Sequence, residues 1–399
     1  MGTLRTLGLA MVLAAPLLAL SPQSEWLRAQ PDYAWSFPED HGPHPGYKTE
    51  WWYFTGLLAD SGVVGNSGVM GDAGLMGDEA AEDRPPDLGY QFTLFKVGVL
   101  PAPPASSSPW ATTDVLMGHM AITDLETGAH VFREVLHRAA PPLAGFPTAP
   151  DNDTIAWSLA PAGTSGRWVL RRTDTGFALA GAGAELHMNL ALDTVSPMVF
   201  QGPNGYSRKS SREGRASMYY SYTDLRTSGT VEVDGQARAV TGTSWMDHEF
   251  SSDPLEEAQV GWDWFSLRLN DGRAVMAFQL RDSTGAPGFR HLTVTRPGEE
   301  DSYPDAGAWS LTPRTSPEST WESPETEAIY PVGWTVQLQG GEGPWTVAAM
   351  ESAAENVSKR IPGLFYWEGP VEVTDAEGAV IGRGYLEMTG YGEGSRPAL

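Results

Sequence analysis

The sequence predicts an all-β fold of two tandem antiparallel units, and its composition, its length and an internal repeat support this prediction. Its 399 residues include 45 Gly, 31 Pro and 15 Trp, and short apolar segments between turn residues are typical of sandwiches and barrels. A chain of this length exceeds the size at which a single core stops growing. We therefore expect two domains, residues 30–250 and 251–399, after a signal peptide at residues 1–29.

The N-terminal segment has the pattern of an export signal. Arg5 precedes an apolar run from Leu7 to Leu20, which is short for a membrane span and suits the centre of a signal peptide. We expect a secreted or periplasmic protein without a transmembrane segment once this signal is removed. The chain has no cysteine, which excludes disulfides and thiolate metal sites.

The predicted first unit opens on the aromatic strand Tyr47–Leu58 and resumes at Tyr90–Val99. Between them, the glycine-rich and acidic residues 60–89 bury too little apolar area to order themselves, so we expect a surface insertion. Short strands then follow at Leu116–Asp124, Ala129–Arg138, Ile155–Leu159, Trp168–Arg172, Phe177–Ala182 and Ala184–Leu192.

An internal repeat joins the middle of the chain to its end. Gly229–Met246 matches Gly369–Leu386 without a gap, and 7 of the 18 positions are identical. The aromatic segment Trp51–Phe54 likewise resembles Trp262–Phe265. Each unit therefore opens with an aromatic strand and closes with a strand of one pattern, and a single duplication on this scale favours two domains over a solenoid.

The second unit begins after a linker at about residues 251–260, where Pro254 and an acidic run suit exposed backbone. We expect its strands to form a meander, at Ala274–Arg281, Phe289–Thr295, Gly333–Leu338, Trp345–Met350 and Leu364–Val373.

Two ionisable residues on otherwise apolar strand faces are the first candidates for a catalytic site. Strand alternation places His248 on one face with Phe250, and Asp263 on one face with Phe265. Burial of such groups is unfavourable unless they are partnered or used. Asp263 is therefore either the partner of a buried tyrosine or tryptophan, or a functional group.

The repeat distinguishes shared positions from differing ones. Asp247 aligns with a second acid, and we interpret this shared position as part of the fold. His248 aligns with Met388 and Asp263 aligns with Trp52, so these two sites carry an ionisable group in one copy only. His248 is either a packed histidine that bonds the backbone or Asp247, or a functional group.

Other chemistry finds little support in the sequence. There is no HExxH, no GxSxG and no glycine-rich phosphate loop, although a Ser-His-Asp triad stays open because triads assemble in space. A metal near residues 246–249 would need distant ligands such as His119 or His291, and we expect neither a metal nor a cofactor. The net charge of −24 disfavours nucleic acid and anionic membranes as partners.

Four segments in order, TEWWYFTG, SWMDHEF, GWDWFSLRL and GYLEMTGY, resemble signature segments of the AttH and carotenoid 1,2-hydratase family, a group often labelled predicted secreted hydrolases. The resemblance spans nearly the whole mature chain. It implies two tandem lipocalin-like, calycin-type antiparallel β-barrels, and barrels of this kind can hold one small apolar ligand.

In the hydratase branch, the resemblance implies acid catalysis by His248, beside Phe250 where hydratases favour Trp, and by Asp263. Hydration of an isolated double bond needs a proton donor in a dry pocket, aromatic faces near the cation and one water. Strand parity argues against Trp262 and Trp264 both sharing a face with Asp263. The ligand-binding candidates are Glu50, Trp52, Phe250, Trp262, Trp264 and Tyr220.

Two functions are compatible with these observations. The first is an exported AttH-domain protein that binds an isoprenoid, polyketide or lipid and acts as a cofactor-free lyase or hydrolase, by acid-catalysed hydration, hydrolysis or cyclisation. The alternative is a non-catalytic lipocalin-like carrier or accessory protein of an envelope ABC-type export system, with a transporter as its partner. Both need the same pocket, so the fold alone does not separate them.

Overall fold

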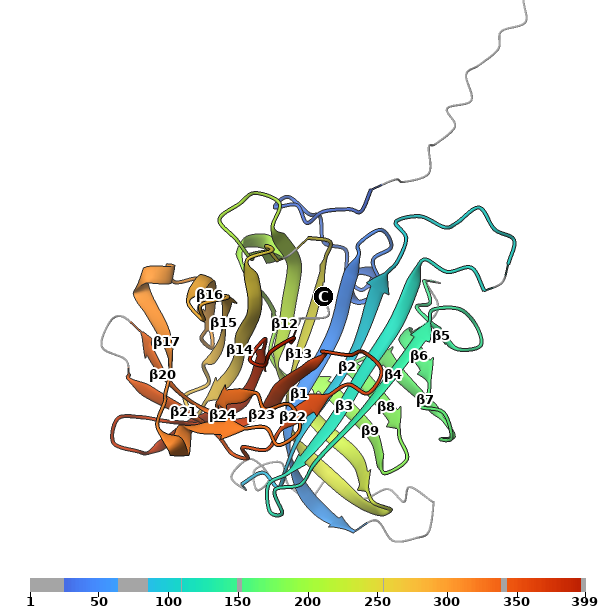
Figure 1. Ribbon diagram of the computed structural model, residues 1–399. Coiled ribbons are helices and arrows are strands. Elements are labelled where there is room, and N and C mark those ends of the chain that lie inside the picture. Colours follow the sequence, from blue (N-terminus) through green and yellow to red (C-terminus); the bar gives the residue numbers. More distant parts are fainter. Residues whose placement is uncertain are drawn as a thin grey trace, which may run out of the picture.

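The computed structural model describes residues 25–63, 85–108, 110–148, 153–253, 255–338 and 343–395. Within these ranges the chain is nearly all β, with a 13-stranded sheet, a 9-stranded sheet and a two-stranded ribbon (Figure 1). The first sheet is a nearly closed barrel and the second is half a barrel. The predicted all-β fold with two antiparallel units is confirmed, and the second unit is more open than a complete barrel.

The first sheet has the strand order β4-β3-β2-β1-β13-β12-β9-β8-β7-β6-β5, and β10 and β11 pair with β12. His137 Nδ1 of β4 lies 2.9 Å from Ser158 Oγ of β6, so the two ends of the sheet meet. Its strands are β1 (Thr49–Val63), β2 (Leu88–Gly98), β3 (Asp114–Asp124), β4 (His130–Arg138), β5 (Ala144–Gly145), β6 (Thr154–Leu159), β7 (Arg167–Arg172), β8 (Gly176–Ala182), β9 (Leu186–Thr194), β10 (Met198–Phe200), β11 (Tyr206–Arg208), β12 (Ala216–Val233) and β13 (Gln236–Ser251).

The second sheet has the order β16-β15-β14-β24-β23-β21-β20-β17, with β22 paired to β23, and β18 pairs with β19 separately. Its strands are β14 (Gln259–Leu269), β15 (Ala274–Asp282), β16 (Pro287–Thr295), β17 (Trp309–Pro313), β20 (Gly333–Leu338), β21 (Trp345–Ala349), β22 (Glu355–Val357), β23 (Phe365–Thr374) and β24 (Val380–Thr389); the ribbon is β18 (Thr320–Glu322) and β19 (Ile329–Pro331). Short 3₁₀ turns occur at η1 (Glu39–His41), η2 (Pro203–Gly205), η3 (Ala306–Ala308) and η4 (Pro317–Ser319).

The two units share one plan, in which the first strand pairs with the last. In the first unit β1 pairs with β13, and in the second β14 pairs with β24. The two copies of the sequence repeat form the hairpins β12–β13 and β23–β24. Asp234 and Gly235 connect β12 to β13 with positive φ angles of 51° and 77°, as a two-residue Asp-Gly hairpin turn requires.

Some predicted segments lie outside the described residues. These are residues 1–24 of the predicted signal peptide and residues 64–84 of the predicted insertion. At the ends of that insertion, β1 continues to Val63 and β2 begins at Leu88. The chain passes from the first sheet to the second between Ser251 and Gln259. In the described part of the chain, no helix has the length and apolar character needed to span a bilayer.

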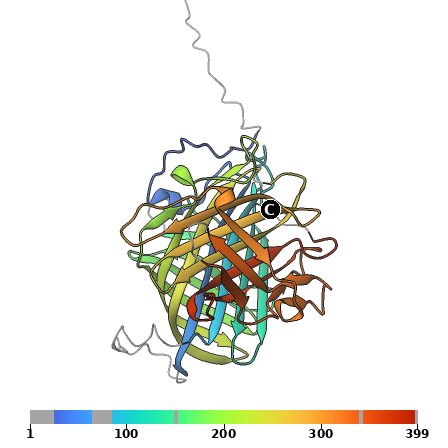
Figure 2. The ribbon, with the colours of Figure 1, turned by 90° about the vertical axis from the view of Figure 1, so that its left-hand side faces the viewer.

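Apolar side chains form a core inside each unit and a third cluster between them. Trp52 and Phe54 of β1 belong to the core of the barrel, and Phe265 belongs to that of the half-barrel. The intervening residues alternate outward, so Tyr53 and Trp264 meet in the cluster between the units. Figure 2, viewed from the side of the second sheet, shows its strands crossing in front of the barrel.

Candidate functional site

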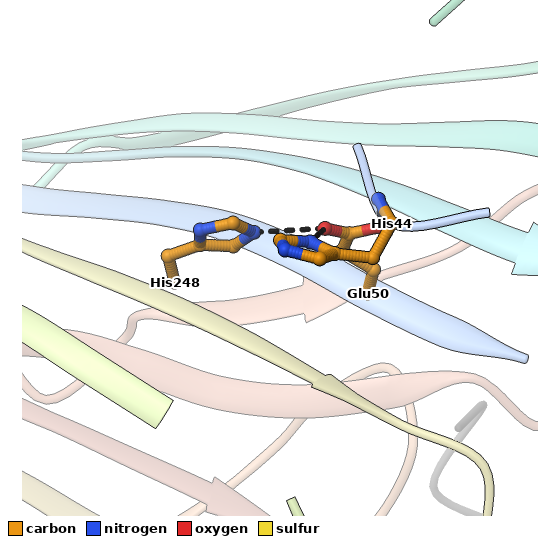
Figure 3. A group of neighbouring side chains, drawn as sticks. All are labelled: His44, Glu50 and His248. Atoms are coloured by element: carbon orange, nitrogen blue, oxygen red, sulfur yellow. Dashed lines mark hydrogen bonds and ion pairs between the residues drawn. The ribbon is translucent and has the colours of Figure 1, made fainter. Parts of the chain in front are cut away.

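The structure brings several predicted residues together around His248, where the segment before β1 packs against the barrel. His248 of β13 lies opposite Trp52 of β1 on one side and Tyr220 of β12 on the other. Glu50 and Phe250 complete this group. Figure 3 shows that His44, from the segment before β1, points to the same carboxylate as His248. The sequence prediction did not include His44.

Glu50 is the centre of this cluster. Its Oε1 lies 2.6 Å from His44 Nδ1 and 2.9 Å from His248 Nε2. Its Oε2 accepts the backbone N–H of His44 at 2.8 Å and lies 3.5 Å from Lys96 Nζ. Burial raises the pKa of Glu50, but the charge of His44, hydrogen bonds from both histidines and the charge of Lys96 hold it well below its usual range. Glu50 is therefore ionised.

His44 carries the matching positive charge. Burial lowers its pKa, but the charge of Glu50 and hydrogen bonds to Asp40 and Glu50 raise it to about 9. Its Nε2 lies 3.3 Å from Asp40 Oδ1, and its ring stacks on Phe250 with centroids 3.7 Å apart. At neutral pH, His44 and Glu50 form a buried ion pair.

Tyr220 links His248 to the segment before β1. Its hydroxyl lies 3.0 Å from His248 Nδ1 and 2.7 Å from His41 Nδ1. Trp52 stacks on the other side of His248, with ring centroids 4.9 Å apart. Burial lowers the pKa of His248 below its usual value, so this ring is neutral at neutral pH.

His44, Glu50 and His248 are also the described residues whose ligand atoms lie close enough to hold a metal, within 4.8 Å of one another. The ring nitrogens facing Glu50 act as its hydrogen-bond donors, and His44 is protonated. None of the three residues lines the cavity between the sheets. The donor set in this arrangement therefore fits an ion-pair network that joins the N-terminal segment to the barrel.

Asp263 lies in a different place, inside the second unit. Its carboxylate accepts hydrogen bonds from Arg281 Nε at 3.0 Å, Gln279 Nε2 at 2.8 Å and Tyr391 Oη at 2.8 Å. Burial raises its pKa, although the charge of Arg281 opposes the shift. The structure therefore does not bring Asp263 and His248 into one site; each has partners of its own, and one partner of Asp263 is a tyrosine.

A cavity lies between the two sheets, on the faces of β13 and β14 that point away from His248 and Asp263. The volume of this cavity that is open to the centre of a water molecule is about 120 Å³. Trp262 and Trp264 line this cavity, and alternation along β14 points them away from Asp263. The other lining residues are Trp51, Tyr53, Gln91, Phe95, Met117, His119, Lys209, Tyr219, Asp247, Glu249, Leu255, Phe278, Leu280, Leu364, Phe365, Tyr366, Glu387 and Thr389.

Asp247 is a buried acid in the wall of this cavity. It accepts hydrogen bonds from Tyr219 Oη at 2.5 Å, Ser221 Oγ at 2.5 Å and Trp245 Nε1 at 2.7 Å. Trp264 Nε1 donates in turn to the Tyr219 hydroxyl at 3.1 Å. Burial raises the pKa of Asp247 to about 7 despite these three donors.

Glu387 is the second acid of the cavity and stands opposite Glu368 in the β23–β24 pair. Glu368 is buried and Glu387 is half-buried, and neither forms an ion pair with a cation in the described part of the chain. Burial and the nearby negative charges raise the pKa of both groups, that of Glu387 to about 8. Two close carboxyls in an apolar setting retain a proton, so the pair carries one at neutral pH.

The sequence contained a signal for these acids. Asp247 and Glu387 occupy matched positions of the two repeats, and we interpreted that match as a mark of the fold. In the structure the closing strands β13 and β24 direct both acids to the space between the units. An ionisable residue on an aromatic outward face, repeated in both copies, predicts a surface that the two copies bury against each other.

A family profile and two solved structures are similar to this chain. A profile described as AttH-like matches residues 76–391. The structure is similar to a crystal structure of an AttH protein from Nitrosomonas europaea, with 29% identity, a TM-score of 0.72, and coverage of 92% of this chain and 99% of that one. It also resembles kievitone hydratase from Nectria haematococca, with 14% identity, a TM-score of 0.56, and coverage of 92% and 96%. Proteins with curated functions give no match.

Proposed function

The chain belongs to the AttH-like family, and on this premise we propose that it transforms a small hydrophobic molecule by acid catalysis in the cavity between its two sheets. The observation that carries the proposal is the pairing of Glu387 with Glu368 on neighbouring strands beside a mostly apolar cavity. Burial and the nearby negative charges raise the pKa of both carboxyls, which favours a retained proton at neutral pH. A carboxylic acid kept neutral by burial is a proton donor suited to this task.

The proposed reaction is the addition of water to a carbon–carbon double bond, or its reverse. Glu387 gives its proton to one alkene carbon, the oxygen of a water bonds to the other carbon, and a proton of that water returns to the carboxylate. The indole rings of Trp262 and Trp264 line the cavity, and aromatic faces stabilise the intermediate cation. No cofactor takes part in these steps.

A similar structure supports the choice of reaction. Kievitone hydratase, by its name, adds water to its substrate, and it shares this fold. We extend hydration to this chain as a proposal, with an isoprenoid, polyketide or lipid as the substrate class. Secretion or a periplasmic location belongs to the same proposal, because it rests on the apolar run from Leu7 to Leu20.

The mostly apolar lining of the cavity also favours a second candidate, a carrier that binds its ligand without changing it. In that case an envelope transporter is the expected partner. A carrier needs the cavity but not the proton of Glu387. Substitution of this residue therefore separates the two functions.

The test uses the purified protein with lipid and isoprenoid extracts, followed by mass spectrometry. We expect a product that has gained one water, and we expect Glu387→Gln to remove it while the thermal unfolding midpoint stays close to that of the wild type. Glu377→Gln, the same change at an exposed position of the β23–β24 connection, serves as the control. Unchanged turnover in Glu387→Gln would refute the role of Glu387, and a stoichiometric, unaltered ligand would identify a carrier.

A further inference from the structure

A chain of hydrogen-bonded side chains reaches the cavity from the side of the first unit. His130 Nε2 lies 2.9 Å from Asn356 Oδ1, and Asn356 Nδ2 donates to Gln91 Oε1 at 3.2 Å. Gln91 Nε2 donates to the Tyr366 hydroxyl at 3.1 Å, and this hydroxyl lies 2.7 Å from His119 Nδ1. The chain thus crosses from β4 through β22, β2 and β23 to β3.

The direction of this chain determines the tautomer of His119. The Tyr366 oxygen accepts a hydrogen from Gln91, so its own hydrogen points to His119 Nδ1, which is the nearby acceptor. Burial lowers the pKa of His119 to about 3, so the ring is neutral and has a single N–H. That hydrogen is on Nε2.

The Nε2–H of His119 is a buried donor without an acceptor. Among the residues that the structure describes, no polar atom lies within hydrogen-bonding distance of it. The residue is 1% exposed, borders the cavity, and has the rings of Phe95 and Phe132 edge-on beside it. Buried donors in folded proteins are almost always satisfied, and an unsatisfied one beside a cavity marks where a ligand can supply the acceptor.

We propose that His119 Nε2–H donates a hydrogen bond to a neutral oxygen of the ligand, a carbonyl or a hydroxyl. The ligand is then an oxygenated apolar molecule rather than a pure hydrocarbon. A carboxylate ligand is disfavoured because the lysine of the cavity, Lys209, already pairs with Glu249 at 2.9 Å, and Asp247 is a further acid in the same wall. This inference rests on the proposed function for the choice of cavity and names its substrate class.

Two measurements test it. The first is the long-range proton–nitrogen NMR spectrum of the imidazole rings, which we expect to show hydrogen on Nε2 of His119. The second compares acetophenone with ethylbenzene, two probes that differ in a carbonyl oxygen, through quenching of tryptophan fluorescence. One neutral hydrogen bond corresponds to about a five-fold tighter binding of the ketone.

The variants make this preference specific to one atom. His119→Phe keeps an aromatic ring but removes the donor, and we expect the preference for the ketone to disappear. His119→Gln places an amide N–H near the same position and should retain it. His291→Phe is the control, because His291 is a half-buried histidine that does not line the cavity.

Hydrogen on Nδ1, an unchanged preference in His119→Phe, or no saturable binding of either probe would each overturn the inference. The wild-type NMR spectrum decides the tautomer even if His119→Phe is too unstable to assay. Glu387→Gln should retain the preference for the ketone. If only the proposal of acid catalysis is wrong, Glu387→Gln will keep its turnover and will still bind the ketone more tightly than ethylbenzene.

Discussion

Replacing Asp263 with asparagine removes the negative charge that faces Arg281 inside the second unit. Asp263 is fully buried, and Arg281 is 6% exposed with its Nε 3.0 Å from the carboxylate. The guanidinium also donates to the backbone oxygen of Thr389 and lies 4.0 Å from the ring centre of Tyr391. The guanidinium of Arg281 is therefore held in place and cannot reorient toward solvent when Asp263 is replaced.

The expected cost follows from this geometry. Breaking a buried ion pair by removing one partner costs ~3–5 kcal/mol, because the remaining charge stays buried. The asparagine oxygen can still accept one hydrogen bond, so we expect Asp263→Asn to lower the free energy of unfolding by about 3 kcal/mol. Proteins are typically stable by about 5–15 kcal/mol. The variant should thus fold, with a clearly lower free energy of unfolding.

Urea unfolding at pH 7, followed by tryptophan fluorescence, measures this change. Asp263→Leu combined with Arg281→Met removes both charges and should recover most of the loss. Asp305→Asn changes an exposed aspartate and should stay within about 0.5 kcal/mol of the wild type. A loss below about 1 kcal/mol in Asp263→Asn, together with abolished turnover, would refute our reasoning and return Asp263 to the catalytic role that the sequence suggested.

Two further predictions concern other buried groups. His248→Phe removes a hydrogen bond to the ionised Glu50, so the free energy of unfolding should fall by about 2 kcal/mol while the folded variant retains turnover; wild-type stability with lost turnover would contradict this. The folded pKa of Asp247, about 7, lies above its ordinary value of 3.8, so the folded state binds the proton more tightly than the unfolded state. The contribution of Asp247 to the free energy of unfolding should therefore fall by ~4 kcal/mol as the pH rises from about 4 to about 7. Urea unfolding at several pH values measures this dependence, and Asp247→Asn should remove it. If the variant shows the same pH dependence as the wild type, this prediction is wrong.

Local sequence pattern was sufficient for much of the fold. The two-residue alternation of strands predicted that His248 and Met246 share one face and that Trp245 lies on the other. In the structure Met246 belongs to the core of the barrel, and Trp245 belongs to the cluster between the units. The repeat matched Gly229–Met246 with Gly369–Leu386, and in the structure these two segments form equivalent hairpins, β12–β13 and β23–β24. These features are readable because the side-chain period of a strand depends on backbone geometry alone.

Local sequence pattern could not predict which residues pair with the buried charges. His44 reaches Glu50 from a segment without regular strand pattern, and Arg281 reaches Asp263 from the neighbouring strand β15. Both pairs depend on strand register and on the path of a loop. Register is decided by the packing of whole faces, which no single residue reveals.

The sequence by itself determined the β class, the duplication and the face on which each residue of the signature strands lies. Only the tertiary structure decided that His248 and Asp263 belong to separate, partnered networks, and that Asp247 and Glu387 meet at a cavity between the units. The physical reason is that alternation is a local property of the backbone, whereas burial, charge pairing and pKa depend on strands brought together from distant parts of the chain.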